Sequence, residues 1–213
     1  MLMNILNLWQ TLAVLFAAYL IGALPFGVIA AKICGVDIFQ IGSGSTGATN
    51  VIRACGKAWG LAVLSLDLAK GAAATCLGLL CFPANPWLVV SCGALALVGH
   101  SASVFIKFRG GKSAASGMGV LLILGGWKLF LFIAVFVLIV RQLTGYQSTA
   151  SLLGALLTAI LFFVLPSPPP APYPPAYQLL SLTAAVFVWL KHLPNIKRLL
   201  NGTETRITGG NNG

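Results

Sequence analysis

Long apolar stretches, separated by short polar loops, dominate the pattern of this chain. They cover residues 8–33, 59–82, 87–105, 114–140, 152–165 and 177–190. A helix needs roughly 20 mainly apolar residues to cross a bilayer. The pattern therefore predicts an all-α, polytopic integral membrane protein, and Pro25 predicts a kink in its first helix.

The stretch at residues 114–140 decides the predicted topology. If it crosses once, Arg141 and the cations of the C-terminal region lie outside, against the tendency of Lys and Arg to stay on the cytoplasmic side. A break at residues 125–128 would make two short helices that return the chain to the side it came from. We therefore predict about seven helices, which are five full spans and a short hairpin, with the N-terminus outside and the C-terminus cytoplasmic.

Composition supports the membrane class. Of the 213 residues, 58% are hydrophobic and 8% are charged, whereas soluble domains carry about 25% charged residues. The formal net charge of +10 would suggest nucleic acid in a soluble protein. In a membrane protein it indicates positive cytoplasmic loops and attraction for anionic substrates or lipid headgroups, so no nucleic-acid partner is expected. We predict one membrane domain over residues 1–213, with a disordered tail at 206–213.

Residues 42–53, the glycine loop, read GSGSTGATNVIR. With so few side chains in the way, the backbone N–H groups of this loop can face outward together and form a nest for an oxyanion. The loop also matches G-x-G-x-x-G, but a dinucleotide site would need a preceding strand and a soluble βαβ unit. We interpret the loop as a phosphate cradle.

Residues 100–112, the lysine loop, hold Lys107, Arg109, Gly110, Gly111 and Lys112. Three cations and two glycines this close together predict a flexible, positive surface suited to phosphate, with Lys112 as the ligand. A simple inside-positive anchor would explain Lys107 and Arg109, but not the pair of glycines.

Asp67 and Lys70 lie three residues apart within the predicted span at 59–82, on one face of a helix. Charges in a span usually pair or line a polar cavity, and we expect structural pairing here. His100 and His192 are candidates for catalysis. The sequence places no acidic partner near either histidine, so no Ser-His-Asp arrangement is indicated.

Metal ligation is not predicted, because two histidines and three carboxylates are too few and too scattered. The five cysteines form no C-x-x-C motif, and we interpret them as small buried hydrophobic residues.

Near the C-terminus, residues 166–175 (PSPPPAPYPP) predict a stiff, polyproline-like outer loop. Residues 191–206 predict a basic, partly amphipathic cytoplasmic tail.

Polar motifs recur along nearly the whole chain in the order and spacing of a known family. They are Gly42-Ser43-Gly44, Gly47-Ala48-Thr49-Asn50, Arg53, Gly99-His100, residues 108–112, Tyr146, Ser148, Ser151, His192, Asn195-Ile196 and Arg198. Together they resemble the bacterial acyl-phosphate-dependent glycerol-3-phosphate acyltransferases. Two positions depart from that family's usual pattern, because Ser45 stands where it usually has Asn and Ser113 where it usually has Gly.

The resemblance implies a seven-helix fold in the bacterial inner membrane with a cytoplasmic active site. It implies transfer of an acyl chain from acyl phosphate to the 1-hydroxyl of sn-glycerol 3-phosphate, without a cofactor. The products would be lysophosphatidic acid and phosphate, in the first step of phospholipid synthesis. A soluble phosphate:acyl-carrier acyltransferase would supply the acyl phosphate.

The resemblance also implies roles for single residues. The catalytic residues would be Ser43, Lys112 and His192. Glycerol 3-phosphate would be bound by Arg53, Lys112, Ser151, His192 and Asn195. Acyl phosphate would be bound by Ser43, Gly44, Ser45, Gly47, Thr49 and Asn50.

Two other classes of protein compete with this interpretation. A membrane transporter of phosphate-bearing solutes would also need a basic nest, but the chain shows no inverted repeat or pair of broken helices at the midplane. A purely structural membrane subunit would leave both glycine-containing loops unexplained.

Overall fold

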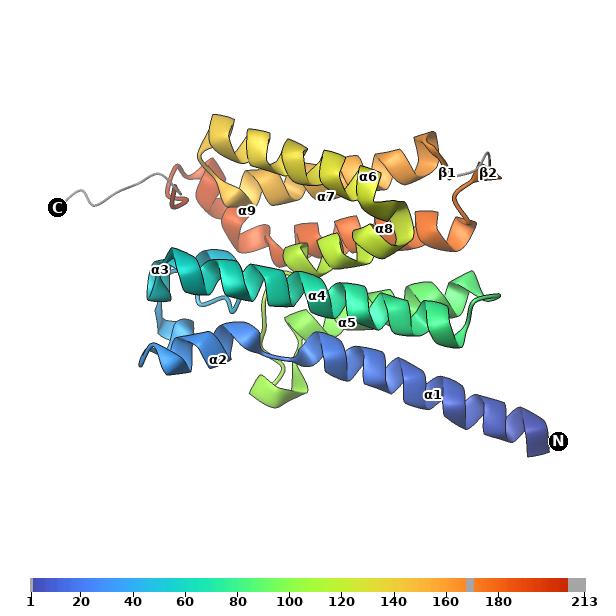
Figure 1. Ribbon diagram of the computed structural model, residues 1–213. Helices are drawn as coiled ribbons and strands as arrows, with labels where there is room; N and C mark the ends of the chain where they lie inside the picture. The colour runs from blue at the N-terminus through green and yellow to red at the C-terminus, as the bar shows by residue number, and fades with distance from the viewer. Residues whose placement is uncertain (1, 168–170, 207–213) are drawn as a thin grey trace. The chain divides into compact units, whose positions relative to one another are not determined.

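The computed structural model describes residues 2–167 and 171–206, so the predicted tail beyond Arg206 lies outside the described residues. The chain forms two compact units, Met1–Leu124 and Gly125–Gly213, which are described separately below. Most residues of both units are helical (Figure 1). The all-α prediction is therefore confirmed, while the sidedness of the termini stays a prediction.

The first unit is built on three long helices that pack side by side, with shorter helices at one end (Figure 1). Its elements are α1 (Leu2–Ala23), α2 (Phe26–Ile33), η1 (Ile38–Gln40), α3 (Ala48–Cys55), α4 (Lys57–Cys81), α5 (Pro86–Ser101), η2 (Val104–Ile106) and the first part of α6 (Ala114–Thr144). The predicted kink at Pro25 is a break between α1 and α2. Helices α1 and α5 approach closely because Gly22 lies directly against the backbone of Ala96, where a Cβ would collide.

Helices α4 and α5 form a hairpin with a short turn. Asn85 caps α5, since its side-chain oxygen accepts hydrogen bonds from the N–H groups of Trp87 (3.1 Å) and Leu88 (3.3 Å). The predicted span at 87–105 is wrong at its far end, because α5 stops at Ser101. The chain leaves the helix there and closes a loop in which Ser103 pairs with Arg109.

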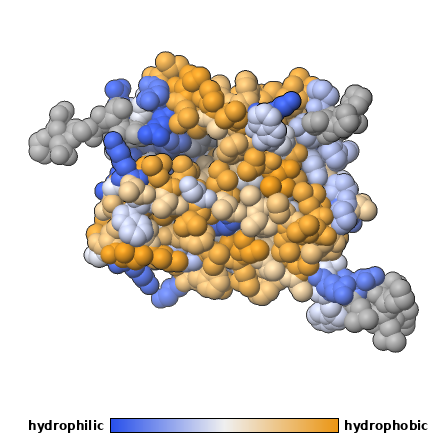
Figure 2. All heavy atoms as spheres, viewed as in Figure 1, coloured by the Kyte–Doolittle hydropathy of each residue, from blue (hydrophilic) through white to orange (hydrophobic). Residues whose placement is uncertain are grey.

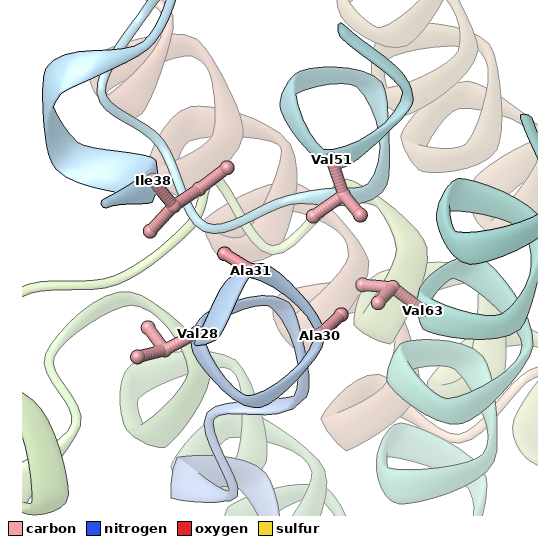
Figure 3. Close-up of a cluster of buried hydrophobic side chains, with 6 residues drawn as sticks. All are labelled: Val28, Ala30, Ala31, Ile38, Val51 and Val63. Atoms are coloured by element: carbon pink, nitrogen blue, oxygen red, sulfur yellow. The ribbon is translucent and has the colours of Figure 1, made fainter. Parts of the chain in front are cut away.

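One hydrophobic cluster connects the short helices of the first unit to α4. Figure 3 shows its six side chains pointing toward one another from α2, η1, α3 and α4. They are Val28, Ala30, Ala31, Ile38, Val51 and Val63, all at most 9% exposed. Because η1 and α3 flank the glycine loop, this cluster holds the loop at one end of the unit.

The second unit contains the rest of α6, then α7 (Gln147–Val164), β1 (Pro166–Ser167), β2 (Ala171–Pro172), α8 (Pro175–Lys191) and α9 (Leu193–Leu200). Helices α7 and α8 pack together, and the indole N–H of Trp189 donates to the Leu152 carbonyl (3.1 Å). The polyproline-like prediction is wrong for the ends of its loop, since β1 and β2 pair antiparallel. Residues 168–170 lie outside the described chain.

Helix α6 is interrupted where the sequence predicted a break. Gly126 has φ 76° and ψ 168°, so two helices join there at a kink. Only glycine adopts that backbone conformation without strain. The predicted break within 125–128 is therefore confirmed.

Within residues 2–167 and 171–206, length and hydropathy identify four helical segments able to cross a membrane, or five if the bent pair α8–α9 counts as one span. Helix α5 is apolar but only 16 residues long. Hydrophobic residues cover most of the face in Figure 2, and large side chains such as Trp9 and Phe16 are more than 60% exposed. Such a surface is suited to a lipid surrounding rather than to water.

Candidate functional site

The glycine loop is built around one buried side chain, that of Asn50, which is 2% exposed. Its amide nitrogen donates to three backbone carbonyl oxygens, and its Oδ1 accepts from the N–H of Ser43 (3.2 Å). The three carbonyls are those of Ile38 (3.2 Å), Ile41 (2.9 Å) and Ser45 (3.0 Å). Asn50 therefore shapes the loop from inside, so the structure favours an organising role over direct contact with a phosphate.

Several backbone N–H groups of the loop point inward. That of Gly44 donates to the Ile41 carbonyl (3.0 Å), and that of Gly47 donates to the Ser45 hydroxyl (3.4 Å). The prediction that these amides face outward together is wrong, because the loop closes on itself. Ser45, which departs from the resemblance, still serves as a hydrogen-bond acceptor at its position.

Within the glycine loop, the start of α3 offers backbone N–H groups to an anion. Gly47 is the N-cap and makes no side-chain capping bond, and the first N–H groups of any helix have no acceptor within that helix. Together with the helix dipole, they favour an anion at Ala48 and Thr49. Arg53, exposed in the last turn of α3, packs over Gly42 and adds a cation to the same loop.

The lysine loop is clamped onto the end of α5. The N–H of Gly111 donates to the His100 carbonyl (3.1 Å), and the Ser101 hydroxyl donates to the Gly111 carbonyl (2.9 Å). A Cβ on Gly111 would collide with the His100 ring, and one on Gly110 with the His100 carbonyl. The prediction of flexibility is therefore wrong, since these glycines permit close packing.

Helices α1 and η1 also hold the lysine loop in place. The Ser103 hydroxyl donates to the Ala23 carbonyl (2.6 Å), and the Arg109 guanidinium stacks over the Phe39 ring at 5.2 Å. Ile106 packs against the cluster of Figure 3. The structure thus brings the two predicted phosphate loops together within the first unit, with Lys112 half-buried at the end of the second loop.

Ser113 shows how the chain accommodates its second departure from the resemblance. Its φ is 61°, in the left-handed region that favours glycine. The side chain is fully buried, and its hydroxyl donates to the Leu97 carbonyl (2.7 Å) and lies 2.8 Å from the Ser101 hydroxyl. These contacts offset the backbone strain.

We expect the stability to fall in the order wild type, Ser113→Gly, Ser113→Ala. Both variants lose the hydroxyl contacts, each of about 1 kcal/mol. Only glycine also relieves the left-handed strain of about 1 kcal/mol. Thermal unfolding in detergent would measure the order, and an alanine variant at least as stable as the glycine variant would contradict it.

Asp67 and Lys70 are paired as predicted, with Asp67 Oδ1 2.9 Å from Lys70 Nζ. Lys70 also donates to the Leu24 carbonyl at the break between α1 and α2 (2.9 Å). The expectation that His100 has no acidic partner is wrong, because its Nδ1 lies 3.4 Å from Asp67 Oδ1. Asp67 and His100 stand equally far from the α4–α5 turn, a register that could have predicted their contact.

In the second unit, polar residues gather around Glu204, which sequence reasoning did not assign to the site. Its carboxylate accepts hydrogen bonds from the Ser148 hydroxyl (2.9 Å), the Asn195 amide (2.7 Å) and Arg198 Nε (2.7 Å). The Glu204 side chain is only 6% exposed. Glu204 is the sole carboxylate in the basic tail at residues 191–206, and this feature of the sequence could have indicated its role.

The neighbouring predicted site residues also lie in the second unit. His192 is buried, and its Nδ1 lies 2.8 Å from the Val188 carbonyl. Since a carbonyl only accepts, Nδ1 carries the proton of this contact. Ser151 accepts from the Gln147 amide (3.3 Å), and the Tyr146 hydroxyl accepts from Arg206 Nε (3.3 Å).

The pKa of Glu204 should make this cluster sensitive to acid. Burial raises the pKa, but the hydrogen bonds from Asn195, Arg198 and Ser148 and the charge of Arg198 hold it below its ordinary value of 4.5. A carboxyl whose pKa is lower in the folded state stabilises the fold above its unfolded pKa. That stabilisation is lost as the pH falls through the folded pKa.

We therefore expect the melting temperature of the wild type to fall as the pH drops below about 4.5. Glu204→Gln should be less stable at pH 7 by about 1–3 kcal/mol, because it loses charge-assisted hydrogen bonds. It should also lose less stability than the wild type on acidification. Melting curves at pH 7 to 4 would test this, and parallel pH profiles would contradict it.

In the described ranges 2–167 and 171–206, no group of three or more His, Cys, Asp or Glu residues could hold a metal ion. The candidate residues instead supply hydroxyls, amides and cations. These groups suit anions.

Comparison with known proteins gives a consistent result. The family model described as glycerol-3-phosphate acyltransferase matches residues 12–202. The glycerol-3-phosphate acyltransferase of Trichormus variabilis is 39% identical over 221 residues, covering 95% of each chain. That of Synechococcus sp. (strain JA-3-3Ab) is 42% identical over 190 residues, covering 89% of each chain.

Two solved structures share the fold. One is the crystal structure of PlsY, an integral membrane glycerol 3-phosphate acyltransferase, in its glycerol 3-phosphate form, with a TM-score of 0.85 and 33% identity over 93% of this chain and 96% of that one. The lysophosphatidic acid form has a TM-score of 0.83 and 33% identity over 92% of this chain and 95% of that one. These matches confirm the expected family and the multi-pass integral membrane fold. The chain therefore belongs to the glycerol-3-phosphate acyltransferase family.

Proposed function

We propose that this protein transfers an acyl chain from acyl phosphate to the 1-hydroxyl of sn-glycerol 3-phosphate. The products are lysophosphatidic acid and inorganic phosphate, and the reaction is the first step of phospholipid synthesis. The observation that carries the proposal is the likeness, over 93% of this chain, to PlsY in a glycerol 3-phosphate form. The paired loops of the first unit support it, because both suit phosphate groups.

Different residues of the two loops would bind the phosphate of glycerol 3-phosphate and that of acyl phosphate. Arg53 and Lys112 bind the phosphate of glycerol 3-phosphate as charged donors. Acyl phosphate is bound by the exposed Ser43 hydroxyl and by the amides at the uncapped start of α3, around Thr49. Gly44, Ser45 and Gly47 shape this loop, since their polar groups are engaged within it.

The family resemblance assigns Ser151, His192 and Asn195 to the binding of glycerol 3-phosphate as well. The Nδ1 contact of His192 with the Val188 carbonyl fixes the plane of its ring, and Glu204 fixes the Asn195 amide. Fixed side chains bind a polyol phosphate without first losing rotamer entropy. His192 would in this way orient the attacking hydroxyl.

The chemical step would be a direct attack. The 1-hydroxyl oxygen of glycerol 3-phosphate forms a bond to the acyl carbonyl carbon, and the bond from that carbon to the phosphate oxygen breaks. The hydroxyl proton passes to the substrate's own phosphate. Phosphate is a good leaving group, so positioning and charge stabilisation by Ser43 and Lys112 suffice without an acyl-enzyme.

The location follows from the same proposal. Both loops and the basic tail would lie on the cytoplasmic side of the bacterial inner membrane, as the positive-inside tendency favours. The acyl chain would stay in the bilayer while the phosphate groups meet in water. A soluble phosphate:acyl-carrier acyltransferase would deliver the acyl phosphate to that side.

The test is release of inorganic phosphate by purified protein in lipid or detergent. Palmitoyl phosphate is given with and without glycerol 3-phosphate, and palmitoyl-CoA serves as a separate donor. We expect release that depends on glycerol 3-phosphate and yields lysophosphatidic acid. No release by folded protein would overturn the proposal and favour a transporter of phosphate-bearing solutes, which a liposome flux assay would detect.

A further inference from the structure

Three ionisable side chains meet inside the first unit, beneath the lysine loop. Asp67 and Lys70 extend from α4, and His100 lies near the end of α5; their side chains are 2%, 4% and 4% exposed. Asp67 Oδ1 contacts both Lys70 Nζ (2.9 Å) and His100 Nδ1 (3.4 Å). Among the described residues, neither Asp67 Oδ2 nor His100 Nδ1 makes a hydrogen bond, so Asp67 and His100 interact through a 3.4 Å electrostatic contact.

Stability alone does not explain this cluster. Taking charges out of water is costly, and apolar residues of similar volume often stabilise a fold as well as a buried ion pair does. Charges within a membrane span usually serve function. The question is therefore what Asp67 and His100 act upon.

The His100 side chain connects Asp67 to the lysine loop. One ring nitrogen, Nδ1, faces Asp67. The other, Nε2, lies where a Cβ on Gly111 would be, so the ring packs directly on the Gly111 backbone. The Gly111 N–H also donates to the His100 carbonyl (3.1 Å), so the residue that precedes Lys112 is held from two sides.

We propose that Asp67 and His100 are positioning residues for the phosphate-binding Lys112. Asp67 holds the His100 ring in place through their 3.4 Å contact, and the ring supports the backbone at Gly111, which precedes Lys112. Lys70 balances the charge of Asp67 and ties it to the Leu24 carbonyl, at the break between α1 and α2 (2.9 Å). This inference rests on the proposed function of Lys112.

The expected signature is a change in substrate binding rather than in folding. In His100→Ala the loop keeps Lys112 but loses the ring that supports Gly111. We expect the KM for glycerol 3-phosphate to rise about tenfold, as expected for the loss of about one hydrogen bond to the substrate. The change in kcat should be much smaller. Asp67→Asn should act in the same direction through the same ring.

Two further variants separate positioning from folding. Asp67→Asn leaves Lys70 without its counter-charge, so the pair Asp67→Asn with Lys70→Met restores the charge balance and should still show the raised KM. Thr75→Val is the matched control, because Thr75 is fully buried on α4 but donates only to Gly71 of its own helix (2.8 Å). Its KM should equal that of the wild type.

A double-mutant cycle tests the connection to Lys112. If His100 acts through Lys112, His100→Ala should change the KM less than about twofold in a Lys112→Ala background. Lys112→Arg serves as the background if the alanine variant is inactive. An equal KM rise in both backgrounds, or a normal KM in His100→Ala, overturns the inference while the proposed function stands. Normal kinetics of Lys112→Ala would overturn the proposed role of Lys112 and this inference together.

Discussion

Lys112→Ala and Arg53→Ala are each expected to raise the KM for glycerol 3-phosphate or to abolish turnover. A hydrogen bond to a charged group contributes about 1.5–3 kcal/mol, so the loss of one phosphate contact should lower kcat/KM roughly 10- to 150-fold. Both residues belong to loops that the first unit holds together, through Arg109 on Phe39 and through Ile106. Phosphate release at varied glycerol 3-phosphate concentration would measure the effect.

Lys107→Ala is the matched control for this experiment. Lys107 lies in the same loop and carries the same charge, but it is exposed and has no place in the proposed site. Its removal should change kcat/KM less than about threefold, because a cation that does not contact either substrate acts on the substrates only through a screened field. Near-normal kinetics in both Lys112→Ala and Arg53→Ala would remove these residues from the site.

Much of the fold could be predicted because hydrophobic length and backbone chemistry act locally. The apolar runs specify the long helices, and the break in α6 follows from Gly126, which has φ 76°. The end of α5 could not be predicted from the length of the apolar run. Residues 102–105 are largely apolar, but the hydroxyl of Ser103 binds the Ala23 carbonyl on another helix and turns the chain away.

The candidate site was predicted at the level of residues but not of contacts. Glycine-rich sequence indicated phosphate loops, yet Gly111 is small so that the His100 ring can pack on it, which requires knowledge of a tertiary contact. Asn50 and Glu204 each gather several hydrogen bonds from different elements. A side chain that makes several such hydrogen bonds leaves no periodic pattern in the sequence from which it could be recognised.

Asn50→Ala is expected to lose both activity and stability. The substitution removes the Asn50 partner of the Ser43 N–H and of the Ser45 carbonyl, and it removes one of two donors to each of the Ile38 and Ile41 carbonyls. Unsatisfied buried polar groups cost about 1–3 kcal/mol each before water enters, so we expect a destabilisation of several kcal/mol. Since Ser43 and the start of α3 are positioned by this side chain, kcat/KM should fall about 100-fold or more in the protein that remains folded.

Two variants show whether the loop's shape is what matters. Asn85→Ala is the matched control. Asn85 also belongs to the first unit, and its side chain accepts hydrogen bonds from two backbone N–H groups, but it lies at the start of α5, away from both loops. This substitution should cost about 1 kcal/mol in melting experiments and leave the kinetics unchanged. Ser43→Ala should show the reverse, with native stability and impaired turnover. If Asn50→Ala instead resembled Ser43→Ala, Asn50 would contact substrate directly, because its loss would then affect the reaction without affecting the loop that surrounds it.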